Sequence, residues 1–187
     1  MMAHAFEIAT SGRAKCRGCG MKIEKGALRF GERVPNAFGE GETTLWFHPL
    51  CAAYKRPEPL LEALRAETVP KDAVAREDLP DADALEAIAE EGVAHRRLPR
   101  VAGADRAPTG RARCRNCREL IEKGSWRIGL VFFEEFRFQP SGYIHAGCAT
   151  DYLETVDLLK RIRHFNPGLS TADGHELEVA LGRPPPD

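Results

Sequence analysis

The chain has 187 residues, 43% of them hydrophobic and 29% charged, with a formal net charge of −1. This length allows one ordinary domain or two small ones, and no apolar run approaches the roughly 20 residues that span a bilayer. Residues 1–8 lack the apolar core of a secretory signal. We therefore expect an intracellular protein without membrane contact. The arginine-rich composition, without a nuclear-type basic cluster, favours the cytoplasm of a bacterium, at its nucleoid.

The charge is distributed unevenly along the chain. Residues 57–92 hold three Lys/Arg against eleven Asp/Glu, whereas residues 1–56 hold nine against five and residues 93–152 eleven against six. The two basic segments are compatible with two faces for a polyanion, and the acid is confined to a connector that we expect to be helical. The alternative is that Lys and Arg simply solvate two small domains.

An internal repeat organises the chain. Residues 11–31 and 109–129 align without a gap and share 12 of 21 positions. The similarity resumes twice further on, at 46–52 with 143–149 and more weakly at 79–92 with 169–182. We therefore predict two copies of one module, residues 1–94 and 109–187, each ending in a short helix closed by a glycine, Gly92 or Gly182.

The first copy and the segment after it can be divided into elements by their residue patterns. The turn-forming pair Lys25-Gly26 precedes a strand over 27–34, and Leu60, Leu61 and Leu64 have helical spacing. Residues 95–108 contain prolines, Gly103 and four arginines without periodicity. This composition predicts a flexible basic linker.

The second copy repeats this order. A turn at Lys123-Gly124 precedes a strand over 126–133, and a helical stripe of core residues follows at Tyr152, Leu153, Val156, Leu159 and Ile162. The fold class predicted from both copies is α+β, with two small modules. In each module an antiparallel sheet is flanked by short helices.

The six cysteines fall into two groups of three, an odd number for disulfides within a group. In each group a CxxC pair is followed by an HxxC pair, after 28 residues in the first copy and 27 in the second. Four protein ligands leave no position open for water, which favours two structural Zn²⁺ ions over catalytic ones. The predicted ligands are Cys16, Cys19, His48 and Cys51 in the first copy, and Cys114, Cys117, His145 and Cys148 in the second. Both modules are therefore expected to be zinc-stabilised, each with a zinc-pinned antiparallel sheet.

These cysteines have two alternative interpretations, as ordinary buried thiols or as redox-active pairs. Ordinary buried thiols would not keep four ligand types in register in two copies by chance. A redox CxxC pair of the thioredoxin kind lies at the end of a strand in a βαβ unit, and the sequence pattern contains no such unit.

The motifs together resemble the zinc fingers of poly(ADP-ribose) polymerases and the nick-sensing finger of a nuclear DNA ligase. The resemblance rests on the opening (S/T)GRA(K/R)CRxC, the (L/W)R strand, the long spacing and the HxxC closure after aromatic residues. It implies recognition of DNA strand breaks, largely without reading sequence. Nothing resembles a transferase domain, so we expect no catalytic residues and no enzyme.

The resemblance also implies which residues contact DNA. Arginines before each CxxC pair and in each following strand are expected to contact phosphates, and an aromatic residue on the loop between strands is expected to stack on a terminal base pair. The implied residues are Arg13, Arg29 and Phe38 in the first copy, and Arg111, Arg127 and either Phe136 or Phe138 in the second. Trp46 and Tyr143 are expected in the core rather than at DNA.

The sequence therefore predicts a zinc-dependent protein that binds nicked, gapped or broken duplex DNA, with two fingers on opposite sides of one lesion. The rival interpretation is a protein-interaction adaptor that recruits a repair enzyme or transferase. The near-neutral total charge and the acidic connector favour this rival. RNA binding is a third possibility, and it would require unstacked single strands.

Overall fold

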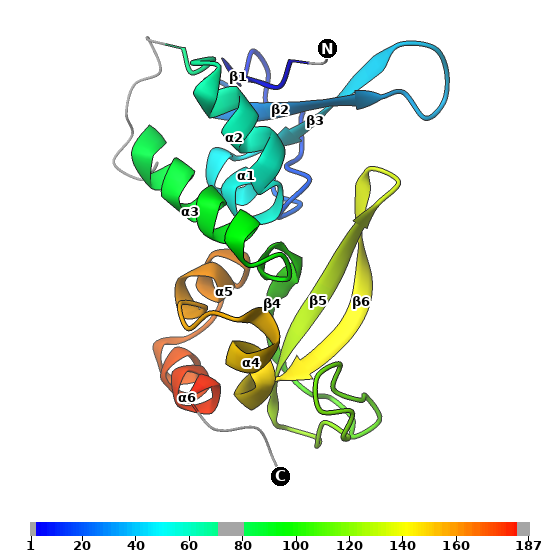
Figure 1. The fold of residues 1–187 in the computed structure, drawn as a ribbon, viewed down its shortest axis with the longest axis vertical. Coiled ribbons are helices and arrows are strands. Elements are labelled where there is room, and N and C mark those ends of the chain that lie inside the picture. Colours follow the sequence, from blue (N-terminus) through cyan, green and yellow to red (C-terminus); the bar gives the residue numbers. More distant parts are fainter. Residues whose placement is uncertain (1–2, 71–80, 183–187) are drawn as a thin grey trace. The chain divides into compact units, whose positions relative to one another are not determined.

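The computed structural model describes residues 3–70 and 81–182 (Figure 1). Its internal contacts divide the chain into two units, one of residues 1–94 with 134–138 and one of residues 95–133 with 139–187. Each unit is described by itself below. No helix within the described part of the chain is long and apolar enough to cross a membrane.

The first unit combines a three-stranded antiparallel sheet with short helices (Figure 1). The strands follow the order β1-β2-β3, so the N-terminal strand pairs with the strand that follows the CxxC segment. The strand predicted over 27–34 is confirmed. The elements are β1 (Ala5–Ile8), β2 (Leu28–Pro35), β3 (Glu42–Phe47), α1 (Pro49–Lys55), α2 (Pro57–Arg65) and α3 (Ala82–Ala94).

Aromatic rings from all three strands form the centre of this unit. Phe30 of β2 is fully buried, with its ring centroid 5.4 Å from that of Phe6 and 6.3 Å from that of Phe47.

Prolines open α1 and α2, where the fixed φ suits the first helical turn and no backbone donor is needed. Leu60 and Leu61 are buried, as the helical spacing predicts.

The acidic helix α3 differs from the prediction at its end. Gly92 lies inside α3 and is buried, so it does not close the helix, which continues to Ala94. A glycine without a side chain suits this packed position, although it stabilises the helix less than alanine. Arg65 of α2 forms ion pairs with Glu86 and Glu90 of α3, at 3.9 and 3.7 Å. The start of the predicted repeat, at residue 79, lies outside the described residues.

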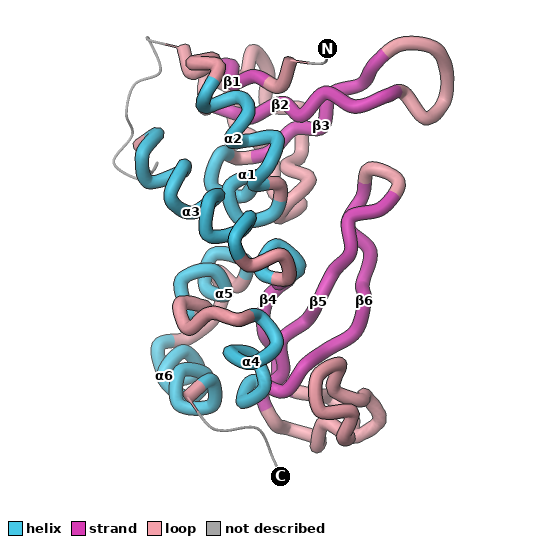
Figure 2. The backbone as a smooth tube through the Cα atoms, viewed as in Figure 1, coloured by secondary structure: helices cyan, strands magenta, loops and turns pink. Residues whose placement is uncertain are grey.

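The second sheet has the strand order β4-β5-β6 and is followed by three short α-helices (Figure 2). All of it lies in the second unit except residues 134–138, at the tip of the β5–β6 hairpin, which belong to the first unit. The strand predicted over 126–133 is confirmed and extends by one residue. The elements are η1 (Leu98–Arg100), β4 (Val101–Arg106), β5 (Trp126–Glu134), β6 (Arg137–His145), η2 (Ala146–Cys148), α4 (Ala149–Leu153), α5 (Leu159–Phe165) and α6 (Thr171–Leu181).

The expectation of a flexible linker over residues 95–108 is wrong. Residues 101–106 form β4, which pairs antiparallel with β5. Leu98, Val101 and Ala104 are buried in the core of the second unit. The sequence of this strand does not show the regular alternation of apolar and polar residues that is typical of a strand. The register shifts between Val101 and Gly103, and a bulge there changes which side chains face the core.

Asn166, at the end of α5, holds the edge of β4. Its side-chain oxygen accepts a hydrogen bond from Ala104 N at 2.8 Å, and its side-chain nitrogen donates to Ala104 O at 3.1 Å. The neighbouring Gly103 has a φ of 144°, and a Cβ there would lie 2.5 Å from the Asn166 Oδ1 atom. Glycine is therefore required for this close approach.

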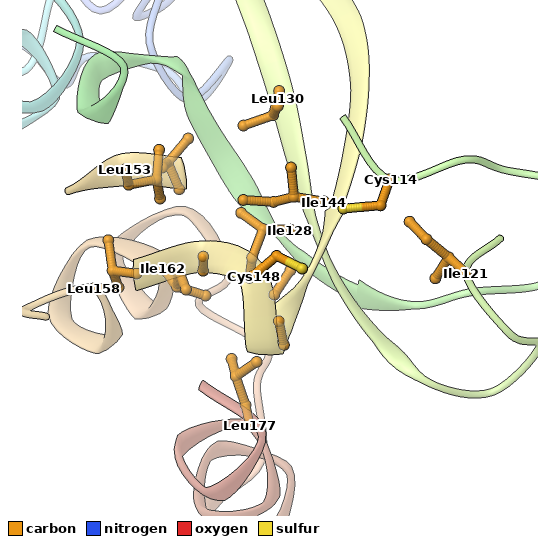
Figure 3. Packing of buried hydrophobic residues seen from close by; sticks show 14 of the residues in the cluster. Cys114, Ile121, Ile128, Leu130, Ile144, Cys148, Leu153, Leu158, Ile162 and Leu177 are labelled. Atoms are coloured by element: carbon orange, nitrogen blue, oxygen red, sulfur yellow. The ribbon is translucent and has the colours of Figure 1, made fainter. Parts of the chain in front are cut away.

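The core of the second unit contains apolar side chains from the sheet and from the helices after it (Figure 3). Ile128 and Ile144 are fully buried, as are Leu153 and Ile162 from the predicted helical stripe. Val156 is 84% exposed, so its expected place in this stripe is wrong. The helix breaks before it because the C-cap residue of α4 has a left-handed φ of 61°. Gly182 does cap α6, as predicted.

Candidate metal centres and nucleic-acid interface

Each unit brings three cysteines and one histidine together. The four ligand atoms of each cluster lie within 4.8 Å of one another, and the clusters are Cys16, Cys19, His48, Cys51 and Cys114, Cys117, His145, Cys148. His48 Nδ1 is 3.4 Å from Cys19 Sγ, and the equivalent distance from His145 to Cys117 is 3.3 Å. These are the eight ligands that the sequence predicts.

Backbone groups support both clusters. Cys16 Sγ accepts hydrogen bonds from the N–H groups of Gly18 and His48, each at 3.3 Å. In the second cluster Cys114 Sγ accepts from Asn116 N and His145 N, each at 3.4 Å. Such donors stabilise thiolates, the form in which cysteine binds a metal.

The orientation of His145 also suits a metal at Nδ1. Its Nε2 atom lies 3.1 Å from Leu120 O, and because a carbonyl oxygen only accepts, the ring proton is on Nε2. Nδ1 then faces the three sulfurs with a free lone pair. Three thiolates and one imidazole fit tetrahedral zinc, and a complete ligand set makes both centres structural.

The clustered groups shift one another's pKa values. Cys16, followed by Cys19, raises the pKa of His48 to about 10. The pKa of Cys51 is raised and that of Cys19 lowered, in both cases mainly through hydrogen bonding to Cys16. Burial opposes ionisation of Cys114, but the backbone donors around its sulfur outweigh this effect and lower the pKa to about 7. The first cluster therefore retains protons at neutral pH that a metal must displace.

We expect zinc affinity to fall as the pH is lowered from 8 to 6. His48 must be neutral to bind through Nδ1, yet its pKa near 10 keeps it protonated in the metal-free cluster throughout this range. Each displaced proton weakens binding by about tenfold per pH unit of acidification. Competition with a chromophoric chelator at pH 6, 7 and 8 measures this dependence. A zinc affinity that stays constant across the three pH values would contradict it.

Arg29 and Arg127, expected at phosphates, occupy equivalent buried positions in the two sheets. Arg29 is 8% exposed, its Nε donates to Glu7 Oε1 at 3.0 Å, and its guanidinium lies 3.6 Å from the centroid of Trp46. Arg127 is 7% exposed and forms two hydrogen bonds with Asp105 of β4, at 2.9 and 2.8 Å. The carboxylate raises the pKa of Arg127. Both arginines thus tie neighbouring strands together.

Sequence reasoning missed the acidic partners of these arginines. Glu7 and Asp105 precede the repeated segment, and Asp105 lies in the supposed linker, so the gapless alignment of the copies did not include them. Tyr143 is the counterpart of Trp46 in the second copy, and the Arg127 guanidinium lies 3.6 Å from the Tyr143 ring centroid. Trp46 and Tyr143 are half-buried, each under an arginine.

Arg13 and Arg111 are placed differently from the strand arginines. Each is exposed and lies three residues before the first ligand cysteine of its cluster. Within residues 3–70 and 81–182, neither has an ion-pair partner. Their guanidinium groups are therefore open to an anion beside each metal centre.

The aromatic candidates also differ between the units. Phe38 is 100% exposed, at the loop between β2 and β3. Phe136 lies in a two-residue turn between β5 and β6, Phe138 lies in β6, and both side chains are half-buried. The structure therefore presents one free ring among the three candidates.

A cavity of about 1310 Å³ lies beside the second metal centre and was not predicted from the sequence. Its wall includes the ligand His145, the exposed apolar side chains of Leu120 and Val179, and charged groups such as Arg106 and Lys123. Because the cavity forms between a loop and α6, no local sequence motif indicates it.

Comparisons with known proteins agree with the first metal centre. Residues 7–95 match the family described as "Poly(ADP-ribose) polymerase and DNA-Ligase Zn-finger region", so this segment is one zinc finger of the poly(ADP-ribose) polymerase type. That match ends before the second cluster, whose ligands are seen in the structure.

Similar proteins include poly(ADP-ribose) polymerases of animals. The chain is 31% identical over 137 residues to the protein of Sarcophaga peregrina, covering 68% of this chain and 14% of that protein. The corresponding values are 38% over 50 residues, 27% and 5% for Drosophila melanogaster, and 31% over 137 residues, 65% and 13% for poly(ADP-ribose) polymerase 1 of Gallus gallus. The chain thus spans 14% or less of the length of these relatives.

The expectation of a bacterial cytoplasm is wrong in the light of these relatives. All three come from animals, two flies and a bird. The arginine content and the lack of a basic cluster, on which the expectation depended, reflect composition and carry little information on the source of a chain.

Proposed function

We propose that this protein is a zinc-dependent DNA-binding protein that recognises nicked, gapped or otherwise broken duplexes. In this proposal residues 109–187 act as a second finger of the same type. The observation that carries the proposal is the fully exposed ring of Phe38 in the segment that matches the zinc-finger family. The exposed Arg13, beside the metal centre of the same finger, supplies a contact for phosphate.

The physical basis is the difference between a broken and an intact duplex. Both present phosphates, so arginine contacts position a protein on either one without distinguishing them. A base-pair face is exposed only where stacking is interrupted, and an aromatic ring that stacks there gains roughly 1 to 3 kcal/mol with any base. A finger with a free ring and free arginines therefore favours breaks without reading sequence.

The proposal is tested with two DNA dumbbells of the same sequence, closed by hairpin loops so that neither has ends. One dumbbell carries a single nick, and the other is intact. The zinc-loaded protein should bind the nicked form more tightly in a fluorescence-anisotropy titration at fixed salt. Equal affinities would reject break recognition and leave general DNA binding.

We expect Arg13→Gln and Arg111→Gln to weaken binding on every DNA sequence tested. Each substitution removes one phosphate contact, so the slope of log K against log salt should become shallower by about 0.9. The matched control is Arg65→Gln, because Arg65 is also exposed but is paired with acidic residues of α3. If the Arg65 variant loses as much affinity as the other two, the assigned contacts are incorrect.

A second candidate function is that of an adaptor that binds a repair enzyme or transferase. The cavity beside the second metal centre favours it, because Leu120 and Val179 are each 48% exposed there among charged side chains. A gel-shift titration separates the two functions. If micromolar protein does not retard nicked DNA, the adaptor is favoured.

A further inference from the structure

The two modules differ in the connection between the last two strands of each sheet (Figure 2). Between β2 and β3, residues 36–41 form a loop in which Asn36 N donates to Gly41 O at 3.0 Å and Phe38 N donates to Asn36 Oδ1 at 3.1 Å. Between β5 and β6 there are only residues 135–136, with φ values of 48° and 61°. Two consecutive positive φ values are typical of a tight hairpin turn.

The two connections also differ in the exposure of the aromatic rings near them. The loop of the first module holds Phe38 entirely in solvent. In the β5–β6 hairpin, whose residues 134–138 belong to the first unit by their contacts, Phe136 and Phe138 are half-buried, and the Phe138 ring centroid lies 6.5 Å from that of Phe47. Phe132 is 47% exposed and has the Arg100 guanidinium 4.4 Å from its ring centroid. A ring that enters a base stack needs an open face, and only Phe38 among these four has both faces open.

The capacity to contact phosphates does not differ in the same way. Residues 11–27 contain five Lys/Arg and one acidic residue, and the aligned residues 109–125 contain five and two. Arg13 and Arg111 are both exposed beside their metal centres. The second module therefore keeps the positive groups of the first but lacks its stacking group.

We propose that the two modules divide the recognition of a broken duplex. The first module stacks Phe38 on the exposed terminal base pair, and the second contacts the phosphate backbone of the adjoining duplex without any stacked ring. This division rests on the proposed function, and it makes Phe38 the single determinant of break specificity. The ligand of the first module is a base-pair face, and that of the second is a continuous polyanion.

The test compares three substitutions in the full, zinc-loaded chain on the nicked and intact dumbbells. Phe38→Ala should weaken binding to the nicked form by roughly 5- to 150-fold, which is the contribution of one stacked base, and leave binding to the intact form unchanged. Phe136→Asn removes the ring with a residue that tolerates positive φ. Phe138→Leu removes the ring and retains apolar volume.

The second-module variants should keep the affinity for nicked DNA within about twofold. The division is overturned if Phe136→Asn or Phe138→Leu weakens nicked binding as much as Phe38→Ala does, or if Phe38→Ala has no effect. In these cases the wild-type protein still prefers the nick and the proposed function stands. If the wild-type protein binds both dumbbells equally, the proposed function and the division fail together. Two equivalents of zinc in every variant confirm that the fingers remain folded.

Discussion

Cys51→Ser is expected to lower the zinc content from two equivalents to one and to unfold the finger around it. Cys51 is 1% exposed, and its sulfur closes the ligand set at the start of α1. Structural zinc contributes about 10 to 16 kcal/mol to the folding of small fingers, whereas a core of this size supplies only about 3 to 5 kcal/mol. Loss of the ion therefore outweighs every other contribution within the finger.

The measurement combines elemental analysis with hydrogen exchange. Cys148→Ser is the matched control, because Cys148 is the equivalent ligand of the second cluster. Amide protection should be lost in β2 and β3 for Cys51→Ser, and in β5 and β6 for Cys148→Ser. A protein that keeps its protection after both substitutions, or after removal of zinc by a chelator, would show that the metal centres do not hold the fold.

Phe30→Ala is expected to destabilise the first module by about 3 to 5 kcal/mol, the range for removing a large aromatic ring from a core. Phe30 is fully buried between Phe6 and Phe47. The same change at Phe38, which is fully exposed, should alter stability by no more than about 0.5 kcal/mol.

Urea unfolding of the zinc-loaded variants measures the change in the free energy of unfolding at each position. The DNA titration then measures the affinity of the Phe38 variant for nicked DNA. Phe38→Ala should weaken nicked-DNA binding in a protein of unchanged stability. The two substitutions thus distinguish Phe30, which stabilises the fold, from Phe38, which we propose contacts DNA. Equal losses of stability at the two positions would mean that Phe38 packs in solution.

The metal ligands and the main strands could be predicted because their signals are local. CxxC and HxxC place two ligands within one turn of chain, and the repeat supplies each motif twice. The turns at Lys25-Gly26 and Lys123-Gly124 likewise mark where β2 and β5 begin. Such patterns need no knowledge of distant residues.

The errors arose where distant residues decide the structure. Residues 95–108 were expected to be a flexible linker because four arginines hide their apolar positions, yet β5 pairs with them and buries Val101 and Ala104. Arg29 and Arg127 remain predicted phosphate contacts, and the sequence did not indicate that carboxylates of neighbouring strands bind their guanidinium groups. The place of Val156 depended on where α4 ends, which the apolar spacing does not indicate.

The side chain of Asn166 has a consequence for how this protein behaves among other copies of itself. A free β-strand edge offers unpaired N–H and C=O groups on which a second chain can build, and this is a common route to aggregation. At Ala104 both groups are already satisfied by one amide side chain. The middle of the strand that begins the second sheet therefore has no unpaired backbone groups to offer a foreign strand, so two copies of this chain cannot join through hydrogen bonds at this point of the edge.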